Sequence, residues 1–187
     1  YSVTIVAYKK GQLEVKGVAW DSNFGGRNFD ELLAEHFCDE FKAKRNLDIR
    51  SNKKAMFRLR SACERVKKVL SANAVTLLNV ENIMDDVDVS AQINRAEFEA
   101  MCLPLMDRFQ APITAALEMA KLGAHEIDFV ELVGGSTRVP AIKDNLIRIF
   151  GREVSTTLNQ DEAIARGCAI QCALQSPVFK VRELSLK

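Results

Sequence analysis

The 187-residue sequence predicts an α/β fold that carries a helix-rich α+β insert. At the start, the runs "SVTIVAY" and "QLEVKGVAW" flank "KKG", a pattern typical of a β-hairpin. From about residue 27 to residue 103, helical spacing predominates. After residue 124 the order becomes apolar run, glycine turn and helix. Together, α/β patterns at both ends and a mostly helical stretch between them indicate a sheet-containing core with an inserted segment.

The inserted segment is expected to begin with two amphipathic helices. Apolar residues recur at helical spacing over 29–46, which predicts the first helix. "DIRSN" breaks that pattern, and either Ser51 or Asn52 is a suitable cap for the second helix, over 53–73.

A strand pair and a capped helix are predicted next. The runs 74–80 and 87–93 have the composition of two strands. Asn94, with Glu97 three residues later, resembles a capping box and therefore predicts a helix over 95–109.

Two prolines indicate that this helical region is interrupted. Pro104 and Pro112 lie within it, and a separate helix is therefore expected over 111–122. Gly123 is the residue expected to end that helix, because glycine readily adopts the conformation of a helix C-cap.

The last third of the sequence predicts two successive turns, each followed by a helix. An apolar strand is expected over 127–133, the glycine turn over 134–138 and a helix over 139–150. A turn then leads into a helix rich in small residues within 155–175. A final strand is predicted over 178–184.

Composition excludes several classes of function. Hydrophobic residues make up 48% and charged residues 27% of the chain, as in ordinary globular domains. The formal net charge of +1 favours neither nucleic acid nor an anionic membrane as a partner. No apolar run approaches the roughly 20 residues that span a bilayer. Because Tyr1 leads directly into a predicted strand, we expect the chain to be a piece of a longer protein.

Cysteine and histidine give no sign of a metal site. The five cysteines include no CxxC pair, and neither His36 nor His125 has a partner at metal-ligand spacing. Cys168 and Cys172 share one face of a predicted helix. All five cysteines are expected to be buried, reduced thiols, as in proteins of a reducing compartment. They are Cys38, Cys63, Cys102, Cys168 and Cys172.

The turn "GGSTR" has the properties of a ligand-binding loop. A glycine turn between a strand and a helix can present backbone N–H groups at the positive end of the helix dipole. Glycine also lets a ligand approach the main chain closely, while Ser136 and Arg138 add a hydroxyl and a planar cation. By itself, the same turn can equally join strand to helix without any ligand.

A polar row runs along the second predicted helix. Arg60, Glu64, Lys67 and Ser71 are offset by 0, 4, 7 and 11 residues, so they fall in a band about 60° wide, with Lys68 at its edge. An acid, two cations and a hydroxyl on one face suit a polyhydroxylated ligand such as ribose. The alternative is a solvated face stabilised by an Arg60–Glu64 pair.

Four motifs occur in the order and spacing of the heat-shock ATPase family. They are "FGGRNFD", "LRSACERVKKVLSAN", "LVGGSTRVP" and "LNQDEAIARGCA". The whole chain resembles the second lobe of that family's actin-like nucleotide-binding domain. Within the family it resembles the large, 110-kDa class, because Gln160 stands where the 70-kDa class usually has proline and Lys68 where it usually has arginine.

The resemblance implies a ribonuclease H-like, actin-like ATPase lobe with two subdomains. Residues 1–26 and 104–187 are expected to form the sheet-containing core, similar to the family's subdomain IIA. Residues 27–103 are expected to form an inserted helical and β subdomain, similar to its subdomain IIB.

The resemblance also implies roles for residues of the second predicted helix. Glu64 and Lys67 match positions that contact the ribose, and Ser71 matches one that reaches the adenine. Lys68 matches one of two side chains that sandwich the adenine ring. Lysine stacks less well than arginine on an aromatic ring, so we expect weaker stacking on that side.

On the other side, the resemblance assigns the glycine turn. Gly134, Gly135 and Ser136 match the turn beneath the nucleoside. Arg138 matches the second member of the sandwiching pair, and Asp161 matches the acid that helps to fix this arginine.

The resemblance implies a cytoplasmic, adenine-nucleotide-binding lobe of a co-chaperone. The parent would bind ATP or ADP, promote nucleotide exchange on a 70-kDa heat-shock chaperone and hold unfolded polypeptides through regions outside this chain. The family's phosphate loops and catalytic lysine are absent from the sequence, so no catalytic residue and no metal ligand are expected here. Mg²⁺ would bind only in the intact two-lobe domain, and hydrolysis by this chain alone should be negligible.

Four further positions are candidate contacts with the 70-kDa partner, because they depart from the ordinary class. They are Ala72, Asn73, Thr157 and Asn159. Neutral drift explains these departures equally well.

Two other interpretations stay open. The chain can be a lobe of an ordinary 70-kDa chaperone ATPase, although Gln160 and Lys68 argue against it. It can also be a structural fragment that binds nucleotide poorly without its other lobe, since half a cleft leaves much of the ligand in water.

Overall fold

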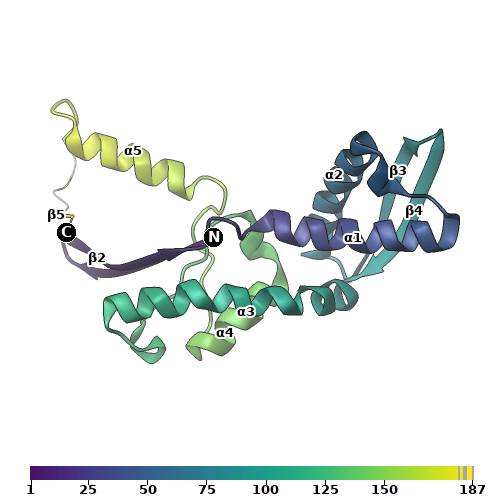
Figure 1. Cartoon of the computed structure of the whole chain (residues 1–187). Helices are drawn as coiled ribbons and strands as arrows, with labels where there is room; N and C mark the ends of the chain where they lie inside the picture. Colours follow the sequence, from purple (N-terminus) through teal and green to yellow (C-terminus); the bar gives the residue numbers. More distant parts are fainter. Residues whose placement is uncertain (181, 183–184, 187) are drawn as a thin grey trace. The chain divides into compact units, whose positions relative to one another are not determined.

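The computed structural model describes residues 1–180, 182 and 185–186 as two compact units. Unit 1 comprises Tyr1–Asn23, Asp107–Thr137 and Lys143–Lys187, and unit 2 comprises Phe24–Met106 and Arg138–Ile142. Figure 1 shows the order of their elements, which mix helix and strand as an α/β sequence pattern predicts.

Unit 1 is built on the predicted hairpin. Strands β1 (Ser2–Lys9) and β2 (Gln12–Trp20) pair antiparallel, with an irregularity between Ile5 and Val6, which confirms the prediction. The two-residue strand β5 (Ser185–Leu186) pairs parallel with β2, so the strand order is β1-β2-β5.

One glycine allows a helix to lie close to this hairpin. A Cβ on Gly17 of β2 would collide with the carbonyl oxygen of Ala116, so only glycine allows so close an approach. The helix contributes two further contacts to the N-terminal segment: Phe109 stacks on Tyr1 with ring centroids 4.2 Å apart, and Arg108 binds Asp21 through two hydrogen bonds of 2.6 and 2.9 Å.

That helix, α3 (Arg95–Ala120), contradicts the predicted interruption by proline. It continues through Pro104 and Pro112 as one helix. The physical reason is a buried stripe that keeps its helical phase past both prolines, so that burial outweighs the lost hydrogen bonds. The stripe consists of Cys102, Met106, Phe109, Ile113 and Ala116.

The end of α3 also differs from the prediction. Lys121, with φ of 56°, takes the left-handed conformation, and the Leu122 N–H donates to the carbonyl of Leu117 at 3.1 Å. Gly123 lies beyond this cap, with φ of −82°. A lysine therefore ends the helix where the sequence indicated glycine. A short 3₁₀ turn, η2 (Ala124–Glu126), follows.

The apolar run 127–133 does not form the predicted strand. It makes only an isolated parallel bridge between Glu131 and Ser155, with backbone hydrogen bonds of 2.8 Å from Leu132 N to Ser155 O and 2.7 Å from Ser155 N to Val130 O. The run lacks the longer ladder of partners that a strand requires.

The two helices predicted after the glycine turn are both present. The turn η3 (Gly135–Arg138) leads into α4 (Pro140–Phe150), and α5 (Ala163–Gln175) follows. The predicted last strand is wrong where it can be described: residues 178–180 and 182 are not extended into a ladder. Its positions 181, 183 and 184 lie outside the described residues.

Unit 2 contains the other predicted elements. Helices α1 (Gly26–Arg45) and α2 (Lys53–Leu70) are joined through the 3₁₀ turn η1 (Ile49–Ser51). Strands β3 (Val75–Met84) and β4 (Val87–Asn94) form an antiparallel hairpin.

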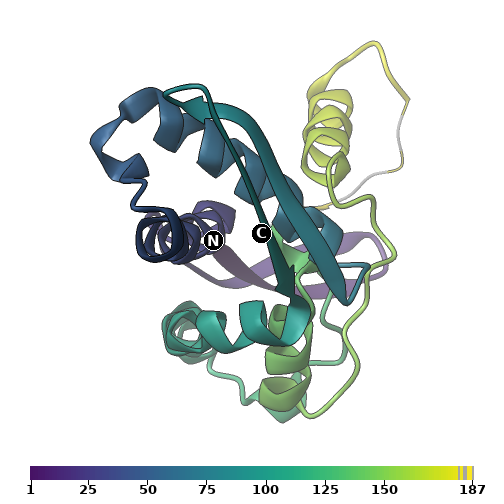
Figure 2. The ribbon, with the colours of Figure 1, turned by 90° about the vertical axis from the view of Figure 1, so that its right-hand side faces the viewer.

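The core of unit 2 lies around α2. This helix packs against α1 and against β3, as the views in Figures 1 and 2 show. Aromatic and aliphatic side chains with less than 2% exposure fill the space between these elements, and their burial drives the packing. Among them are Phe29, Leu33, Phe37, Phe41, Leu59, Leu70, Leu78 and Ile93.

At two predicted helix N-caps, the capping side chain accepts hydrogen bonds from backbone N–H groups of the first turn. The Asn52 side chain accepts hydrogen bonds from Lys54 N at 3.0 Å and Ala55 N at 3.2 Å, so Asn52 rather than Ser51 caps α2. The Asn94 side chain likewise accepts from Glu97 N at 2.8 Å at the start of α3. Both follow from the preference of asparagine for helix N-termini.

The cysteines divide into two groups. Cys38, Cys63 and Cys102 are buried free thiols, as expected, and burial raises the pKa of Cys38 to about 11 and that of Cys102 to about 12. Cys168 and Cys172 are exposed on α5, which contradicts the expected burial of all five. A helix with small residues on several faces gives no sequence signal for which face is covered.

Candidate functional site

The predicted site has two halves, one on α2 and one around the glycine turn, and its residues are divided between the two units. Glu64, Lys67 and Lys68 lie in the last two turns of α2, and Ser71 is the residue at its C-terminal cap. The turn at 134–136 and Asp161 belong to unit 1, whereas Arg138 belongs to unit 2, as α2 does. Each half is described by itself.

Lys67 is the most enclosed residue of the polar row. It is 9% exposed, and its Nζ lies 2.7 Å from Asp30 Oδ1 of α1 and donates to the carbonyl of Gly26 at 3.0 Å. The sequence motif "FGGRNFD" thus supplies two partners for this lysine. Lys67 therefore joins the start of α1 to the end of α2.

The carboxyl group of Asp30 has an unusual environment. Burial raises its pKa above the ordinary value, although the hydrogen bond and charge of Lys67 act in the opposite direction. The side chains of Asp30 and Lys67 are only 15% and 10% exposed. A pair so poorly hydrated needs both partners, because either charge alone would be buried without compensation.

Glu64 and Lys68 form a second, solvent-exposed pair on α2. Lys68 Nζ lies 2.7 Å from Glu64 Oε1, and this hydrogen bond lowers the pKa of Glu64. Ser71 Oγ donates to the carbonyl of Lys68 at 2.6 Å. The acid, the cation and the hydroxyl therefore lie together at the C-terminal end of α2.

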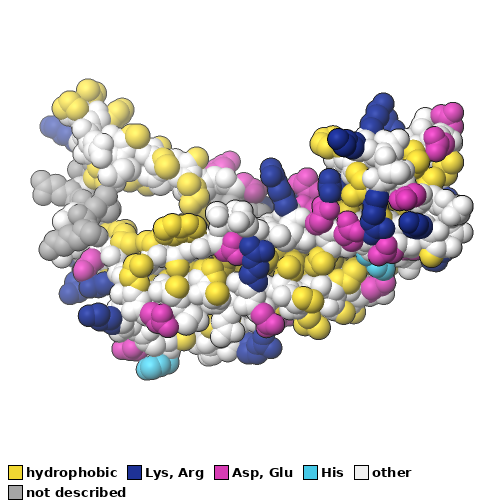
Figure 3. Space-filling model, in the orientation of Figure 1, with side chains coloured by type: hydrophobic (Ala, Val, Ile, Leu, Met, Phe, Trp, Pro, Cys, Tyr) yellow, Lys and Arg dark blue, Asp and Glu magenta, His cyan; other side chains and the backbone are white. Residues whose placement is uncertain are grey.

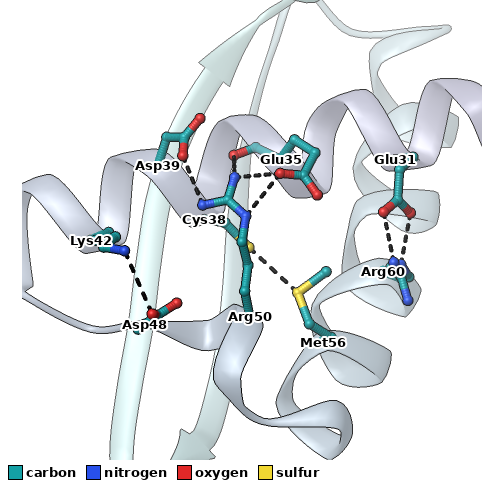
Figure 4. Close-up of polar contacts among 9 residues, drawn as sticks. All are labelled: Glu31, Glu35, Cys38, Asp39, Lys42, Asp48, Arg50, Met56 and Arg60. Atoms are coloured by element: carbon teal, nitrogen blue, oxygen red, sulfur yellow. Dashed lines mark hydrogen bonds and ion pairs between the residues drawn. The ribbon is translucent and has the colours of Figure 1, made fainter.

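Arg60, the first residue of the row, binds a different partner. Its Nε and Nη2 donate to the two carboxylate oxygens of Glu31 in α1, at 2.7 and 2.6 Å (Figure 4). The suggested Arg60–Glu64 pair is therefore wrong, because each of these residues has a different ion-pair partner. A fork-shaped guanidinium binds a carboxylate best with two parallel bonds, which α1 offers.

Figure 4 shows a neighbouring ion-pair cluster on the same helices. Arg50 of η1 reaches Glu35 and Asp39 of α1, with Nη1 2.8 Å from Asp39 Oδ1, and Lys42 lies 3.5 Å from Asp48. These contacts fix η1 against α1 and are separate from the residues assigned to nucleotide.

On the other half, Gly134 needs its glycine backbone. Its φ is +100°, a conformation that L side chains rarely adopt, and its N–H donates to the carbonyl of Gln160 at 2.9 Å. The carbonyl of Gly134 accepts from Thr137 N at 3.1 Å and from Thr137 Oγ1 at 2.6 Å. The N–H of Gly134 is thus engaged within the protein.

The space beside the Cα of Gly135 is nearly empty. A Cβ at this position would meet only Asp161 Oδ1, at 3.8 Å. Asp161 therefore lies beside the turn to which the resemblance assigned it. Gly135 is exposed, Ser136 is half-buried and Arg138 is exposed.

The segment before Asp161 is held by Asn159 and Thr157. The Asn159 side chain accepts from the backbone N–H groups of Asp161 and Glu162, both at 3.0 Å. Thr157 Oγ1 donates to Glu131 Oε2 at 3.1 Å, and the Leu158 N–H donates to Glu131 Oε1 at 2.9 Å. Both side chains have structural roles in this turn.

The pKa of Glu131 reflects these bonds. Burial acts to raise it, but hydrogen bonds from Leu158, Ser155 and Thr157 bring the pKa below its ordinary value. Sequence inspection missed this glutamate, and its position inside "FVELV" gave no polar pattern that would have revealed it.

The remaining partner candidates follow α2 directly. The N–H groups of Ala72 and Asn73 donate to the carbonyl of Val69 at 3.1 and 2.8 Å. Both residues are exposed, so their side chains can meet a partner molecule.

A separate groove lies on the outside of unit 2, between α2 and β3. Its volume is about 390 Å³. None of the nine residues assigned to nucleotide lines it. Its lining residues are Phe57, Arg58, Ser61, Arg65, Asn79, Val80 and Glu81.

Two further observations concern metals and membranes. Among the described residues, no group of three or more His, Cys, Asp or Glu side chains is placed to hold a metal ion. In the same part of the chain, no helix is long and apolar enough to cross a bilayer.

Comparison with known proteins gives a consistent assignment. The family model described as "Hsp70 protein" matches residues 1–187. Among similar relatives, a "Heat shock protein homolog" of Saccharomyces cerevisiae is 53% identical over 97% of this chain. Two human proteins, "Heat shock 70 kDa protein 4" and "Heat shock 70 kDa protein 4L", are 50% and 49% identical over the whole chain.

The chain spans only about a quarter of these relatives: 26% of the yeast protein and 22% of each human protein. The matches confirm the resemblance to heat-shock proteins of the large class that the four motifs indicated. The family's domain has an actin-like ATPase fold, and its members are chaperones that bind and hydrolyse ATP. With a family model that covers every residue from 1 to 187, this chain belongs to the Hsp70 family.

Proposed function

We propose that this chain is the adenine-nucleotide-binding lobe of a large heat-shock co-chaperone. The parent protein would promote nucleotide exchange on a 70-kDa chaperone and hold unfolded polypeptides through regions outside this chain. The observation that carries the proposal is the match to the Hsp70 family over residues 1–187, at about 50% identity to large-class relatives.

The proposed lobe is ribonuclease H-like, with residues 27–103 inserted as a subdomain into a core formed by 1–26 and 104–187. Adenosine would contact Glu64, Lys67, Lys68 and Ser71 on one side and Gly134, Gly135, Ser136, Arg138 and Asp161 on the other. Support comes from within each half: Ser71, Lys68 and Glu64 are neighbours at the end of α2, and Asp161 lies beside Gly135.

Lys67 has a second role beside its proposed contact with adenosine. Because its Nζ is bound to Asp30 and to the carbonyl of Gly26, it also fixes the end of α2. Glu64 and Lys68, which are 51% and 64% exposed in their side chains, are the residues of α2 best able to reach a ligand.

Titration calorimetry with ADP tests this site. We expect binding by the wild-type chain and its loss in Lys68→Ala and Arg138→Ala. Arg65→Ala is the matched control, because Arg65 is a cation on the same helix but lines the separate groove. Equal affinity in all four proteins would contradict the assignment.

We also propose that the chain has no enzymatic activity of its own. ATP or ADP would bind through adenosine contacts, and Mg²⁺ would be held only in the intact two-lobe domain. A metal-dependent ATP turnover by the pure chain, abolished in Arg138→Ala, would refute this proposal.

Contact with the 70-kDa partner would involve Ala72, Asn73, Thr157 and Asn159. The exposed position of Ala72 and Asn73 after α2 supports the first two. Replacement of Asn73 by Ala in the full-length protein should slow nucleotide release from the partner without a change in thermal stability. Unchanged release would remove Asn73 from the interface.

The second candidate is a lobe of an ordinary 70-kDa chaperone ATPase, which the Hsp70 family match also permits. Steady-state ATPase of the full-length protein separates the two. Strong stimulation by a peptide substrate favours the ordinary chaperone, and weak turnover without stimulation favours the co-chaperone.

A further inference from the structure

Helix α5 carries two exposed thiols that the proposed function does not use. Cys168 and Cys172 are both exposed, whereas the other three cysteines are buried. They are four residues apart, so both side chains lie on the same face of the helix. They are therefore the accessible dithiol of this chain.

The surroundings leave this face open. A Cβ added to Gly167, the residue before Cys168, would meet no atom within 4 Å. Ile164, one turn before Cys168 and on the same face, is 70% exposed. Figure 3 shows side chains of the hydrophobic class, which includes cysteine, at the surface over α5.

The nearest charge on the helix is already paired. Arg166 donates through Nε and Nη2 to Glu162 Oε2, at 3.0 and 2.7 Å. The residues between the two cysteines are Ala169, Ile170 and Gln171, which carry no charge. The donor set at this face thus consists of two sulfur atoms without a competing carboxylate or imidazole between them.

The spacing favours a bridged pair of sulfurs over a disulfide. On a helix, residues four apart have Cβ atoms about 5–6 Å apart. A disulfide needs Cβ atoms about 3.5–4.5 Å apart, so it would require the helix to distort. A metal–sulfur bond of about 2.3 Å, the value for zinc, allows one ion to join sulfurs up to about 4.6 Å apart.

We propose that Cys168 and Cys172 form a two-thiolate site for a soft, thiophilic metal ion of the Cu(I) type. Thiolate ligands select soft ions such as Cu(I). A structural zinc site almost always has four ligands, and this face supplies two. On binding, two S–H bonds break, two sulfur–metal bonds form and two protons pass to solvent, with no change in oxidation state.

Anaerobic titration of the whole 187-residue chain with Cu(I), against a competing chelator, tests the site. Native mass spectrometry gives the stoichiometry, and thiolate-to-copper charge-transfer absorption reports the ligands. We expect one ion per chain in the wild type. Cys168→Ser or Cys172→Ser should weaken binding more than about 100-fold, since loss of a mere outer-shell partner already costs about 10–100-fold.

A variant with the same number of exposed thiols but the wrong spacing is the decisive control. The double change I170C/C172S places the second thiol two residues from Cys168, on the other side of the helix. Ile170 is largely exposed, so the change should not disturb packing. We expect this variant to bind as weakly as C172S. Wild-type affinity in I170C/C172S, or in C168S/C172S, would overturn the proposal.

Discussion

The buried ion pair between Asp30 and Lys67 offers the sharpest test of how unit 2 is held together. The two charged atoms lie 2.7 Å apart, and the side chains are 15% and 10% exposed. We consider the changes Asp30→Leu and Lys67→Met, alone and combined. Each single change leaves one buried charge without its partner, whereas the double change removes both charges.

The expected loss of stability follows from two opposing contributions, the attraction between the charges and the cost of their desolvation. At 2.7 Å and an effective dielectric constant of about 20, the attraction is about 6 kcal/mol. Desolvation costs several kcal/mol for each ion, so the net value of the pair is small. Removal of one partner nevertheless costs about 3–5 kcal/mol, because the other charge stays buried. We therefore expect each single variant to lose about 3 kcal/mol or more, and the double variant to lose less than either.

Urea unfolding followed by circular dichroism measures these free energies. Glu64→Leu and Lys68→Met provide the matched control on the same helix, because that pair is 51% and 64% exposed. Its coupling should be only about 0.3–0.5 kcal/mol. Additivity of the Asp30 and Lys67 changes within about 0.5 kcal/mol would refute the reasoning.

The same pair predicts a pH dependence. Burial holds the pKa of Asp30 above its ordinary value, so the folded state binds this proton more tightly than the unfolded state. Stability therefore falls as pH rises from about 4, the unfolded value, through the raised folded pKa. Lys67→Met removes the positive charge that acts to lower the pKa of Asp30. The stability that this variant loses should therefore be partly recovered in acid, where Asp30 is protonated. A Lys67→Met deficit that stays constant from neutral pH to about pH 4 would contradict this account.

Three further predictions concern local structure and thiols. Gly134→Ala should destabilise the protein by about 1–3 kcal/mol, because the φ of Gly134 is +100°. Gly167→Ala on α5, where a Cβ would meet open space, should stabilise the protein by up to about 1 kcal/mol. Thermal unfolding of both variants measures these opposite changes in stability. Asn52→Ala should cost about 1 kcal/mol through loss of the α2 cap, and Asn52→Asp should retain most of that stability in the same assay. A chromogenic thiol reagent should titrate Cys168 and Cys172 rapidly in the native chain and the other three thiols only on unfolding; slow reaction of all five would show that α5 is covered.

Local sequence signals determined much of the secondary structure. The hairpin of β1 and β2, helices α1 and α2, and the caps at Asn52 and Asn94 all depend on residues close together in the chain. Alternation, helical periodicity and side-chain caps act over a few residues, so a single sequence reveals them. The motifs also sufficed to place the chain in the Hsp70 family, which the family model confirms.

Other features were decided by partners distant in sequence. Continuation of α3 through Pro104 and Pro112 depends on burial along the length of the helix. The apolar run 127–133 does not form a strand because its pairing is limited to the bridge at Glu131. Burial of Lys67 against Asp30 and exposure of Cys168 likewise depend on which surfaces meet. Each outcome is set by contacts between segments that are distant in the sequence. The nine residues assigned to nucleotide also lie in segments distant in the sequence, and their assignment stays a prediction. Sequence thus determined the elements that depend on local signals and the family, while tertiary packing decided how far α3 extends, which apolar run pairs as a strand, which charges are buried and which thiols are exposed.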